Sequence, residues 1–272
     1  MTDAAETAGT GLSGIRALVT GGTSGLGLAM ARALAEAGAT VLLTGRDATR
    51  VQEAAARLPG ATGLALDVTN EASVAGAVEQ AWSRRGGLDL LVNNAGIGMR
   101  TVNPRFMIEP QPFWRVPADG FRAVVDTNLT GYFLAAREVA PRMLDAAGGR
   151  IVNISMNHAT MTRQGFVPYG PSRAGAEALS RIMAADLRGT PVTVNILLPG
   201  GVTATGMVPE EYRPPGLQPL DPSVMGPPIV WLASPAAEGV HDERIVATEF
   251  EAWLARRTDR GRPDQPPTIR SG

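Results

Sequence analysis

Short apolar runs alternate with longer helical patterns along most of this chain, and that alternation restricts the fold more than any other feature. The runs cover residues 15–20, 40–44, 63–67, 88–94, 150–155 and 192–198, and most are apolar nearly throughout. Strands that are apolar on both sides are typical of a sheet buried between two layers of helices. Strand–helix alternation also favours right-handed crossovers between parallel strands. We therefore predict an α/β fold with a doubly wound parallel sheet and helices on both faces.

No linker divides the chain, so a single domain is expected over residues 13–257. We expect residues 1–12 to be a flexible N-terminal segment and the polar residues 258–272 to be a disordered tail. Two stretches interrupt the alternation: residues 97–117 are rich in proline and large side chains, and residues 199–221 carry many prolines and glycines.

Composition excludes several kinds of site. The chain has no cysteine, so disulfides and thiolate nucleophiles are excluded, and with only two histidines a metal site is not expected. The net charge of −1 gives no electrostatic support for a nucleic-acid or anionic-membrane partner. No apolar run approaches the roughly 20 residues that span a bilayer. The N-terminus is polar and acidic, unlike a secretory signal. We expect a cytoplasmic protein that binds small molecules.

The first expected strand runs directly into the sequence TGGTSGLG, residues 20–27. Glycines between a strand and a helix allow a tight turn and let a pyrophosphate approach the backbone at the helix N-terminus. The spacing is T-G-x-x-x-G-x-G rather than G-x-G-x-x-G. A simple tight turn is the alternative, and the position after the first strand favours a nucleotide site.

That spacing, followed by NNAG at 93–96 and by a tyrosine and a basic residue four apart at 169 and 173, resembles the short-chain dehydrogenase/reductase family. The resemblance extends over about residues 14–250, and several motifs occur in the family's order. It implies a single Rossmann-like domain, an enzyme that binds a nicotinamide dinucleotide, and a homodimer or homotetramer.

The resemblance also implies which residues contact the cofactor. Asp67 matches the acid that contacts the adenine, residues 94–96 match the turn near the ribose, and residues 199–205 match the segment that holds the nicotinamide amide. The full expected set is Gly21, Thr23, Ser24, Gly25, Leu26, Gly27, Arg46, Asp67, Val68, Asn94, Ala95, Gly96, Tyr169, Arg173, Pro199, Gly200, Val202 and Thr203.

The end of the second strand bears on the choice between the two dinucleotides. NAD-dependent members usually carry an acid there, which accepts from the ribose 2′-hydroxyl. This chain has Gly45 and then Arg46. Arginine can grip a 2′-phosphate with a fork of donors, whereas an acid would repel it. We therefore expect NADP(H), with NAD as the alternative. Asp47 could partly neutralise Arg46.

Four side chains usually share the family's chemistry: an asparagine, a serine, a tyrosine and a lysine. Asn128 matches the asparagine that anchors a water molecule in the proton relay, and Tyr169 matches the tyrosine that acts as acid and base. Arg173 takes the place of the lysine. It keeps the positive charge but is longer, planar and essentially never deprotonated, so it cannot relay a proton as an ammonium group does.

The serine that donates to the substrate oxygen is missing from its usual place, where this chain has Met156. Ser155 lies one position earlier and, on a strand, would point to the opposite face. Three possibilities follow: the loop is shifted so that Ser155 serves; Asn157, His158 or Thr160 donates instead; or the substrate, such as an imine, needs no donor. We rank the first two ahead of the third, and Ser155 completes the catalytic set Asn128, Ser155, Tyr169 and Arg173.

The stretch at 97–117 is expected at the rim of the cleft, where its methionines and aromatic residues suit an apolar substrate. A packing or interface role for this stretch is the alternative. The expected substrate contacts are Phe106, Trp114, Met156 and His158. We expect an oxidoreductase that acts on an alcohol, carbonyl or imine. A lyase, dehydratase or isomerase without net redox, and a dinucleotide-binding regulatory protein, are the alternatives.

Overall fold

Seven parallel strands form one sheet in the computed structural model, which describes residues 11–208 and 210–260. Their spatial order is β3-β2-β1-β4-β5-β6-β7. The strands are β1 Arg16–Val19, β2 Thr40–Gly45, β3 Thr62–Ala65, β4 Leu90–Asn93, β5 Gly149–Ile154, β6 Val192–Leu198 and β7 Arg244–Val246. The order reverses between β1 and β4, and such a switch point opens a crevice at the carboxyl ends of the strands.

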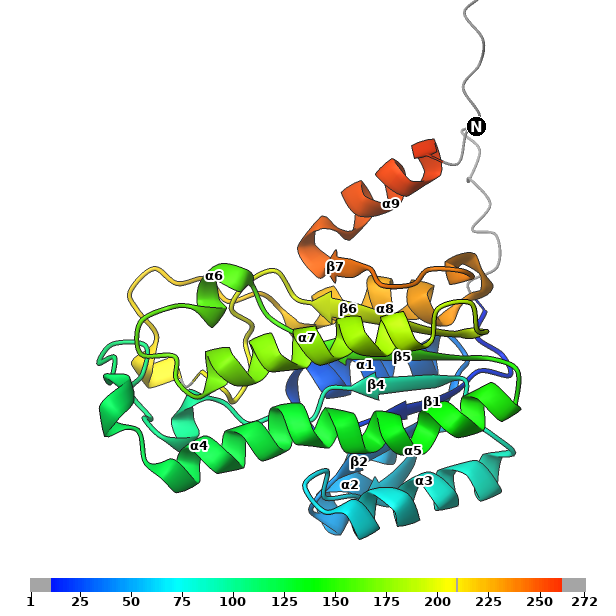
Figure 1. Ribbon diagram of the computed structural model, residues 1–272, viewed down its shortest axis with the longest axis horizontal. Coiled ribbons are helices and arrows are strands. Elements are labelled where there is room, and N and C mark those ends of the chain that lie inside the picture. The colour runs from blue at the N-terminus through cyan, green and yellow to red at the C-terminus, as the bar shows by residue number, and fades with distance from the viewer. Residues whose placement is uncertain (1–10, 209, 261–272) are drawn as a thin grey trace, which may run out of the picture.

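Helices cover both faces of this sheet. They are α1 Gly25–Glu36, α2 Ala48–Ala55, α3 Glu71–Arg85, α4 Ala118–Val125, α5 Gly131–Asp145, α6 His158–Met161, α7 Tyr169–Asp186, α8 Gly226–Ala233 and α9 Phe250–Arg260. The helices α3, α5 and α7 lie in front of the sheet in Figure 1, and α1 and α8 lie behind it. Short turns are η1 Met99–Thr101, η2 Phe113–Arg115, π-helical η3 Asp126–Thr130, η4 Glu210–Tyr212, η5 Pro222–Met225, η6 Pro235–Ala237 and η7 Ala247–Glu249.

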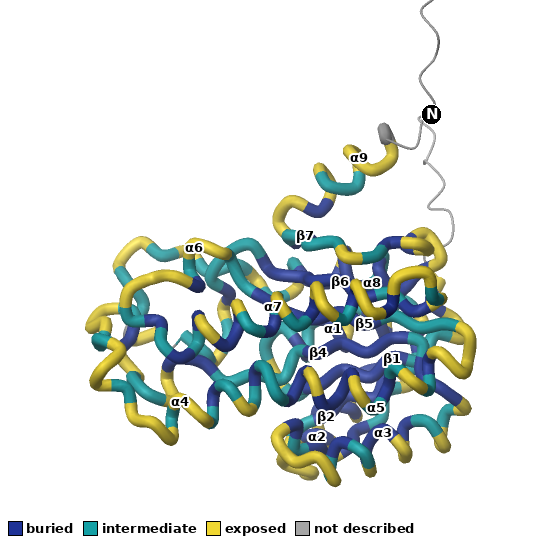
Figure 2. Tube along the Cα trace, in the orientation of Figure 1, coloured by how far each residue is buried: buried dark blue, intermediate teal, exposed yellow. Residues whose placement is uncertain are grey.

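Successive residues of a strand pack into two separate hydrophobic cores, one on each face of the sheet. In β1, Ala17 and Val19 pack with α1, α2 and α8, whereas Leu18 between them packs with α3, α5 and α7. This alternation is what a pleated strand imposes, because neighbouring side chains point to opposite faces. Figure 2 shows the buried segments concentrated in the central strands. The predicted doubly wound parallel sheet is confirmed.

Helix starts follow the local sequence. Asp47 precedes α2 and caps it, because its carboxylate accepts from the N–H of Arg50 at 3.1 Å. Asn70 caps α3 in the same way, accepting from the N–H of Ser73 at 2.9 Å. Ser24, by contrast, precedes α1 without a side-chain cap, so the first N–H groups of α1 remain open. This exception lies where the sequence predicts a phosphate site.

Both ends of the domain differ from their predicted bounds. Leu12, in the segment expected to be flexible, is fully buried in the core around α1. Helix α9 continues to Arg260, three residues into the segment 258–272 that was expected to be disordered. The other residues of both segments, 1–10 and 261–272, lie outside the described part of the chain. Among the described helices, none combines the length and apolar character needed to cross a membrane.

Candidate functional site

A cavity of about 940 Å³ opens at the carboxyl edge of the sheet. Its volume lies within the usual range for ligand sites, about 300–1,000 Å³. Most of the residues that the sequence singles out line it: Gly21, Thr23, Ser24, Gly25, Leu26, Gly27, Arg46, Asp67, Val68, Asn94, Ala95, Gly96, Phe106, Ser155, Met156, Tyr169, Arg173, Pro199, Val202 and Thr203. Four others, Asn128, His158, Trp114 and Gly200, are not among its lining residues.

The glycine loop is fastened to the turn after β4. Asn94 donates through Nδ2 to the carbonyl oxygens of Thr20 and Gly21 at 2.9 and 3.0 Å. The hydroxyl of Thr20 accepts from the N–H groups of Asn94 and Ala95 at 2.9 and 3.0 Å. A Cβ atom added at Gly27 would lie well inside 3.0 Å of Asn94 Nδ2 and of the Gly21 oxygen. Only glycine permits this close packing, so the two motifs form one unit.

Two arginines line the end of the cavity beside β2. Arg46 and Arg50 are both exposed there, and no carboxylate is paired with Arg46 among the described residues. The carboxylate of Asp47 is engaged with the start of α2 instead. Asp67 lies nearby, with Oδ1 accepting from the N–H and hydroxyl of Thr69 at 3.0 and 2.8 Å. Arg50 was not predicted; its place one helical turn after Arg46 is the signal that would have found it.

Tyr169 and Arg173 lie one turn apart at the start of α7, on one face as their spacing predicts. The guanidinium carbon of Arg173 is 5.2 Å from the centre of the Tyr169 ring. Arg173 is buried, at 3% exposure. Its Nη1 donates to the hydroxyl of Tyr132 at 2.6 Å and to the carbonyl of Ile154 at 3.0 Å. Tyr132, on α5, was not predicted, although it follows Asn128 by one helical turn.

Burial and neighbours act in opposite directions on this arginine. Burial opposes its charge, but the phenol groups of Tyr132 and Tyr169 outweigh that penalty and raise the pKa of Arg173 above its ordinary value. Arg173 is therefore a permanent cation in the wall of the cavity.

Asn128 lies in the π-helical turn η3, fully buried behind the cavity wall. Its Oδ1 accepts from the N–H of Ile97 at 2.9 Å, and its Nδ2 donates to the Ile97 carbonyl at 2.9 Å and to the Ser172 hydroxyl at 3.1 Å. The π-turn is the kind of irregularity that is frequent at functional sites. Asn128 thus ties the turn after β4 to α7, and its side chain is fully engaged in doing so.

Ser155 and Met156 follow β5 and have different surroundings. The hydroxyl of Ser155 donates to Oε1 of Glu177 at 2.5 Å. Met156 packs beside the buried cluster of Met99, Phe106 and Phe166, which we call the apolar cluster. The methionine therefore lies on the apolar side of the cavity.

Glu177, one turn beyond Arg173 on α7, also bonds Nε2 of His158 at 2.9 Å and Nε of Arg244 at 3.0 Å. Burial raises the pKa of the Glu177 carboxyl, but the hydrogen bonds from Ser155 and His158 and the charge of Arg244 outweigh it, so the pKa is lowered overall. Arg244 further donates to the Met156 carbonyl at 2.8 Å. No local pattern predicts this cluster, because its members come from the residue after β5 and from α6, α7 and β7. It holds the loop that carries Met156.

The predicted substrate contacts divide. Phe106 and Met156 lie in or against the apolar cluster beside the cavity. Trp114 is 72% exposed and stacks edge-on against Phe113, with ring centres 5.2 Å apart. His158 is exposed and turned to Glu177. The apolar wall is completed by Met107, one of the methionines of the stretch 97–117, and by Phe166, which was not predicted.

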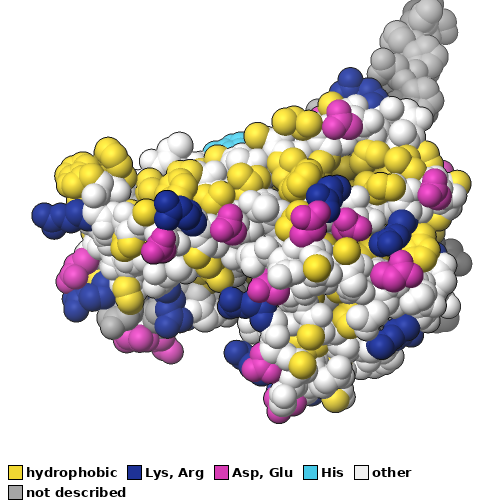
Figure 3. Space-filling model, turned by 60° about the horizontal axis from the view of Figure 1, so that its bottom comes forward, with side chains coloured by type: hydrophobic (Ala, Val, Ile, Leu, Met, Phe, Trp, Pro, Cys, Tyr) yellow, Lys and Arg dark blue, Asp and Glu magenta, His cyan; other side chains and the backbone are white. Residues whose placement is uncertain are grey.

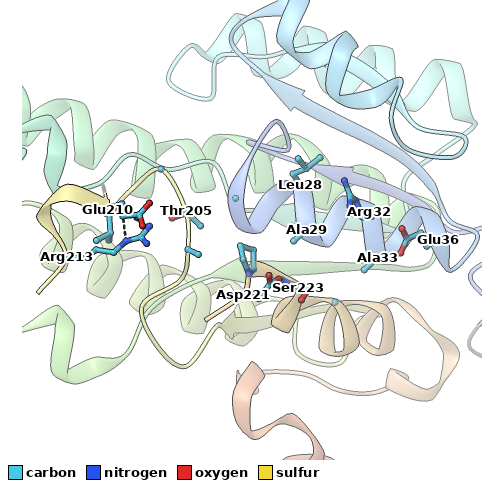
Figure 4. Close-up of a pocket in the computed structure, with 16 residues that line it drawn as sticks. Leu28, Ala29, Arg32, Ala33, Glu36, Thr205, Glu210, Arg213, Asp221 and Ser223 are labelled. Atoms are coloured by element: carbon cyan, nitrogen blue, oxygen red, sulfur yellow. Dashed lines mark hydrogen bonds between the residues drawn. The ribbon is translucent and has the colours of Figure 1, made fainter. Parts of the chain in front are cut away.

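The segment 199–221, which we call the lid, contributes Pro199, Val202 and Thr203 to the cavity. Gly200 faces elsewhere: its φ is +101°, and its carbonyl accepts from Asn157 Nδ2 at 2.9 Å. A second hollow of about 600 Å³ lies between the lid and α1. Figure 4 shows its charged side chains spread along it, with Arg32 and Glu36 along α1, Glu210 and Arg213 at the other end, and Asp221 between them. They do not converge on one ligand position.

Comparison with known proteins agrees with this geometry. A family model described as short chain dehydrogenase matches residues 16–215. The 1-deoxy-11-beta-hydroxypentalenate dehydrogenase of Streptomyces avermitilis is 37% identical over 191 residues, 68% of each chain. A 3-oxoacyl-(acyl-carrier-protein) reductase of Vibrio cholerae is 31% identical over 243 residues, 86% of this chain and 96% of that protein. The structure of 3-ketoacyl-(acyl-carrier-protein) reductase from Brucella melitensis, complexed with NADH, is similar with a TM-score of 0.75 at 28% identity, covering 86% of this chain and 97% of that one.

Proposed function

The chain belongs to the short-chain dehydrogenase family, and from that premise we propose that it transfers hydride between NADP(H) and the carbon of an apolar alcohol or ketone. Its relatives are named dehydrogenases and reductases, so the chain is a NAD(P)-dependent oxidoreductase. The choice of NADP(H), the kind of substrate and the role of each residue are our proposal. The observation that carries it is the pairing of Tyr169 with Arg173 in a cavity that also holds the glycine loop.

The residues at the phosphate end fit a dinucleotide. The uncapped N-terminus of α1 leaves backbone N–H groups without side-chain partners next to the cavity, a ready site for a pyrophosphate. Asp67 would contact the adenine. Asn94 attaches the turn after β4, which would lie near the ribose, to the glycine loop. Bound there, the reduced nicotinamide would supply a hydride to the substrate carbon.

NADP(H) is favoured over NAD(H) by the charges beside β2. Arg46 and Arg50 both line the cavity, and the carboxylate of Asp47 is engaged with the start of α2 rather than with Arg46. Two guanidinium groups that are not paired with a carboxylate suit a 2′-phosphate.

Tyr169 is the proposed acid and base. When a ketone is reduced, its phenol gives a proton to the substrate oxygen, and in the reverse direction it takes the proton from the alcohol. The adjacent Arg173 cation stabilises negative charge on the phenol oxygen. Because a guanidinium group does not release its own protons, the phenol proton must be replenished by another route, through hydroxyl groups or water.

Thr160 is our candidate for the donor that replaces the missing serine. The hydroxyl of Ser155 and the ring of His158 are engaged with Glu177, and the amide of Asn157 is engaged with Gly200. Thr160 lines the cavity, and no hydrogen bond engages its hydroxyl within the described residues. Among the four candidates Ser155, Asn157, His158 and Thr160, the hydroxyl of Thr160 is therefore the group free to donate to the substrate oxygen.

The substrate end favours a bulky apolar molecule. Six apolar side chains face this part of the cavity: Met99, Phe106, Met107, Met156, Phe166 and Val208. Methionine side chains adapt to irregular shapes, and the two phenylalanines meet edge-on with ring centres 5.6 Å apart. The wall therefore favours a hydrocarbon framework over a sugar.

A homodimer is proposed from an exposed apolar face. Phe121 on α4, Phe133 and Leu144 on α5, and Ile182 on α7 are between 40% and 59% exposed. Figure 3 shows hydrophobic side chains gathered in a band across one face of the molecule. Such contiguous patches mark interaction surfaces. Light scattering should give a dimer mass, and Ile182→Glu should shift it towards the monomer.

The cytoplasmic location and the expected lack of metal, nucleic-acid and membrane partners stay predictions from composition.

The proposal is tested by mixing the protein with NADPH or NADH and a panel of bulky apolar ketones, and following the absorbance of reduced nicotinamide. We expect substrate-dependent oxidation of NADPH in preference to NADH. Arg46→Ala should weaken NADPH binding on the order of tenfold or more while leaving NADH binding within about twofold. Arg57→Ala, an exposed cation of the same region that does not line the cavity, is the matched control. Product formed without a change in absorbance would instead indicate a lyase, dehydratase or isomerase, and binding without turnover would indicate a regulatory protein.

A further inference from the structure

The cation in the active-site wall has no acidic partner. Among the described residues, Arg173 Nη1 donates to the Tyr132 hydroxyl and the Ile154 carbonyl, and the Tyr169 phenol interacts with the guanidinium as well. Its Nε is buried without a hydrogen-bond partner within the same part of the chain. A buried charge is costly unless surrounding groups satisfy it, so the groups that do so determine where the guanidinium points.

Tyr132 is built to accept from this cation. Its side chain is 1% exposed, and its hydroxyl donates to the Ile154 carbonyl at 3.2 Å. With its own proton directed at Ile154, the phenol oxygen presents its lone pairs to Arg173 Nη1, 2.6 Å away. Burial raises the pKa of Tyr132, and the charge of Arg173 only partly opposes that rise. The acceptor is therefore a neutral phenol, which orients the guanidinium without neutralising it.

The other edge of the guanidinium reaches the cavity wall. A Cβ atom added at Gly96 would lie well inside 3.0 Å of Arg173 Nη2. Gly96 and Arg173 both line the cavity, whereas Tyr132 does not. Because the guanidinium is planar and rigid, fixing Nη1 also fixes the direction of Nη2 and Nε. Nη2, beside Gly96, is therefore the nitrogen left to donate to hydroxyl groups in the cavity.

We propose that Tyr132 is a positioning residue that lets an arginine work where the family has a lysine, by holding Nη1 so that Nη2 is presented beside Gly96 to the cofactor ribose and the Tyr169 phenol. This inference rests on the proposed function. It makes Tyr132 and Arg173 a coupled pair: the tyrosine hydroxyl is needed with arginine at 173 and dispensable with lysine, whose single nitrogen has a shorter reach.

A double-mutant cycle on the full chain tests the coupling. The dissociation constant of NADPH is measured by fluorescence titration, alongside kcat and KM, for wild type, Tyr132→Phe, Arg173→Lys and the double variant. With arginine at 173, Tyr132→Phe should weaken NADPH binding and lower kcat, each on the order of tenfold, with little change in the substrate KM. With lysine at 173, the same change should alter both by less than about twofold.

Ser180→Ala is the matched control, because it also removes a buried hydroxyl between α7 and β5, where it accepts from Asn153 at 2.8 Å. It should leave NADPH binding and kcat unchanged. Equal losses from Tyr132→Phe in both backgrounds, or no loss with arginine, would overturn the inference while leaving the proposed function intact.

If wild type binds neither dinucleotide, the proposed function fails and this inference with it. Should Tyr132→Phe not fold, a crystal of the wild-type complex with NADPH decides. The expected result is Nη1 bonded to Tyr132 and Nη2 bonded to a ribose hydroxyl. Nη1 turned away from Tyr132 would contradict the inference.

Discussion

Replacing Gly27 by alanine is expected to damage the fold and the site together, whereas the same change at Gly76 is expected to stabilise the chain. At Gly27 the new methyl group would meet Asn94 Nδ2 and the Gly21 carbonyl well inside 3.0 Å, and the carbonyl is backbone that cannot swing aside. At Gly76, exposed in the middle of α3, nothing lies within 4 Å. The two variants share one chemical change, so a general effect of alanine cancels between them.

The magnitudes follow from these surroundings. Overpacking costs about 1–3 kcal/mol, and each of the two hydrogen bonds from Asn94 Nδ2 is worth about 1 kcal/mol. The higher helix propensity of alanine relative to glycine offsets about 0.5–1 kcal/mol of this loss. The net loss at Gly27 is therefore about 2–4 kcal/mol, which lowers the Tm by roughly 4–16 °C for a chain of this size. Gly76→Ala gains only the propensity term, and its Tm should rise by roughly 1–4 °C.

Thermal unfolding followed by circular dichroism measures both shifts, and fluorescence titration of NADPH measures the site. Gly27→Ala should weaken NADPH binding at least about tenfold, because the phosphate loop and the turn after β4 move together. Gly76→Ala should leave binding unchanged. A Gly27→Ala protein as stable as wild type, with wild-type affinity for NADPH, would refute the idea that close packing of the loop against Asn94 shapes the site.

Three further predictions concern the chemical end. Gly96→Ala should displace the guanidinium of Arg173, because the added methyl group would collide with Nη2. The kcat should therefore fall by more than about tenfold. Wild-type kinetics in this variant would count against the assigned geometry. Thr160→Val keeps the shape of the side chain and removes the donor, so it should lower kcat on the order of 10²-fold. Adding Met156→Ser should restore part of this loss. Unchanged kinetics in Thr160→Val would exclude Thr160 as the donor to the substrate oxygen. The carboxyl of Glu177, whose pKa is lowered in the fold, stabilises the protein above the ordinary glutamate pKa of about 4.3, and that stability is lost as the pH falls through the folded value. Glu177→Gln should therefore lower the Tm at neutral pH and flatten its decline on acidification, and a parallel decline in both proteins would contradict this.

Much of the architecture was predictable because its causes are local. The strands are apolar on both faces, and the six expected strands, β1 to β6, all lie within two residues of their expected bounds. The glycine loop and the turn after β4 are each formed by a few consecutive residues, so a short sequence motif is enough to predict them. The spacing of Tyr169 and Arg173 was enough to place them on one face of a helix.

The site was less predictable where distant segments determine it. Trp114 was expected in the cleft from composition, but the fold of its loop turns it into solvent against Phe113. The sequence predicts that Ser155 points to the face opposite Met156. It does not predict that the Ser155 hydroxyl donates a hydrogen bond to Glu177, because that carboxylate comes from α7. Tyr132 carries no motif, and its contact with Arg173 arises only when α5 packs beside α7 and β5.

The role of Tyr169 is tested most directly by comparing wild type with Tyr169→Phe in one preparation, measuring NADPH affinity by titration and ketone reduction by loss of reduced-nicotinamide absorbance. The account predicts that the phenylalanine variant binds NADPH within about threefold of wild type while turnover falls by about 10²–10⁴-fold, the range for losing a general acid. Turnover at the wild-type rate in the variant would contradict it, because the phenol beside Arg173 would then not be the group that moves the proton.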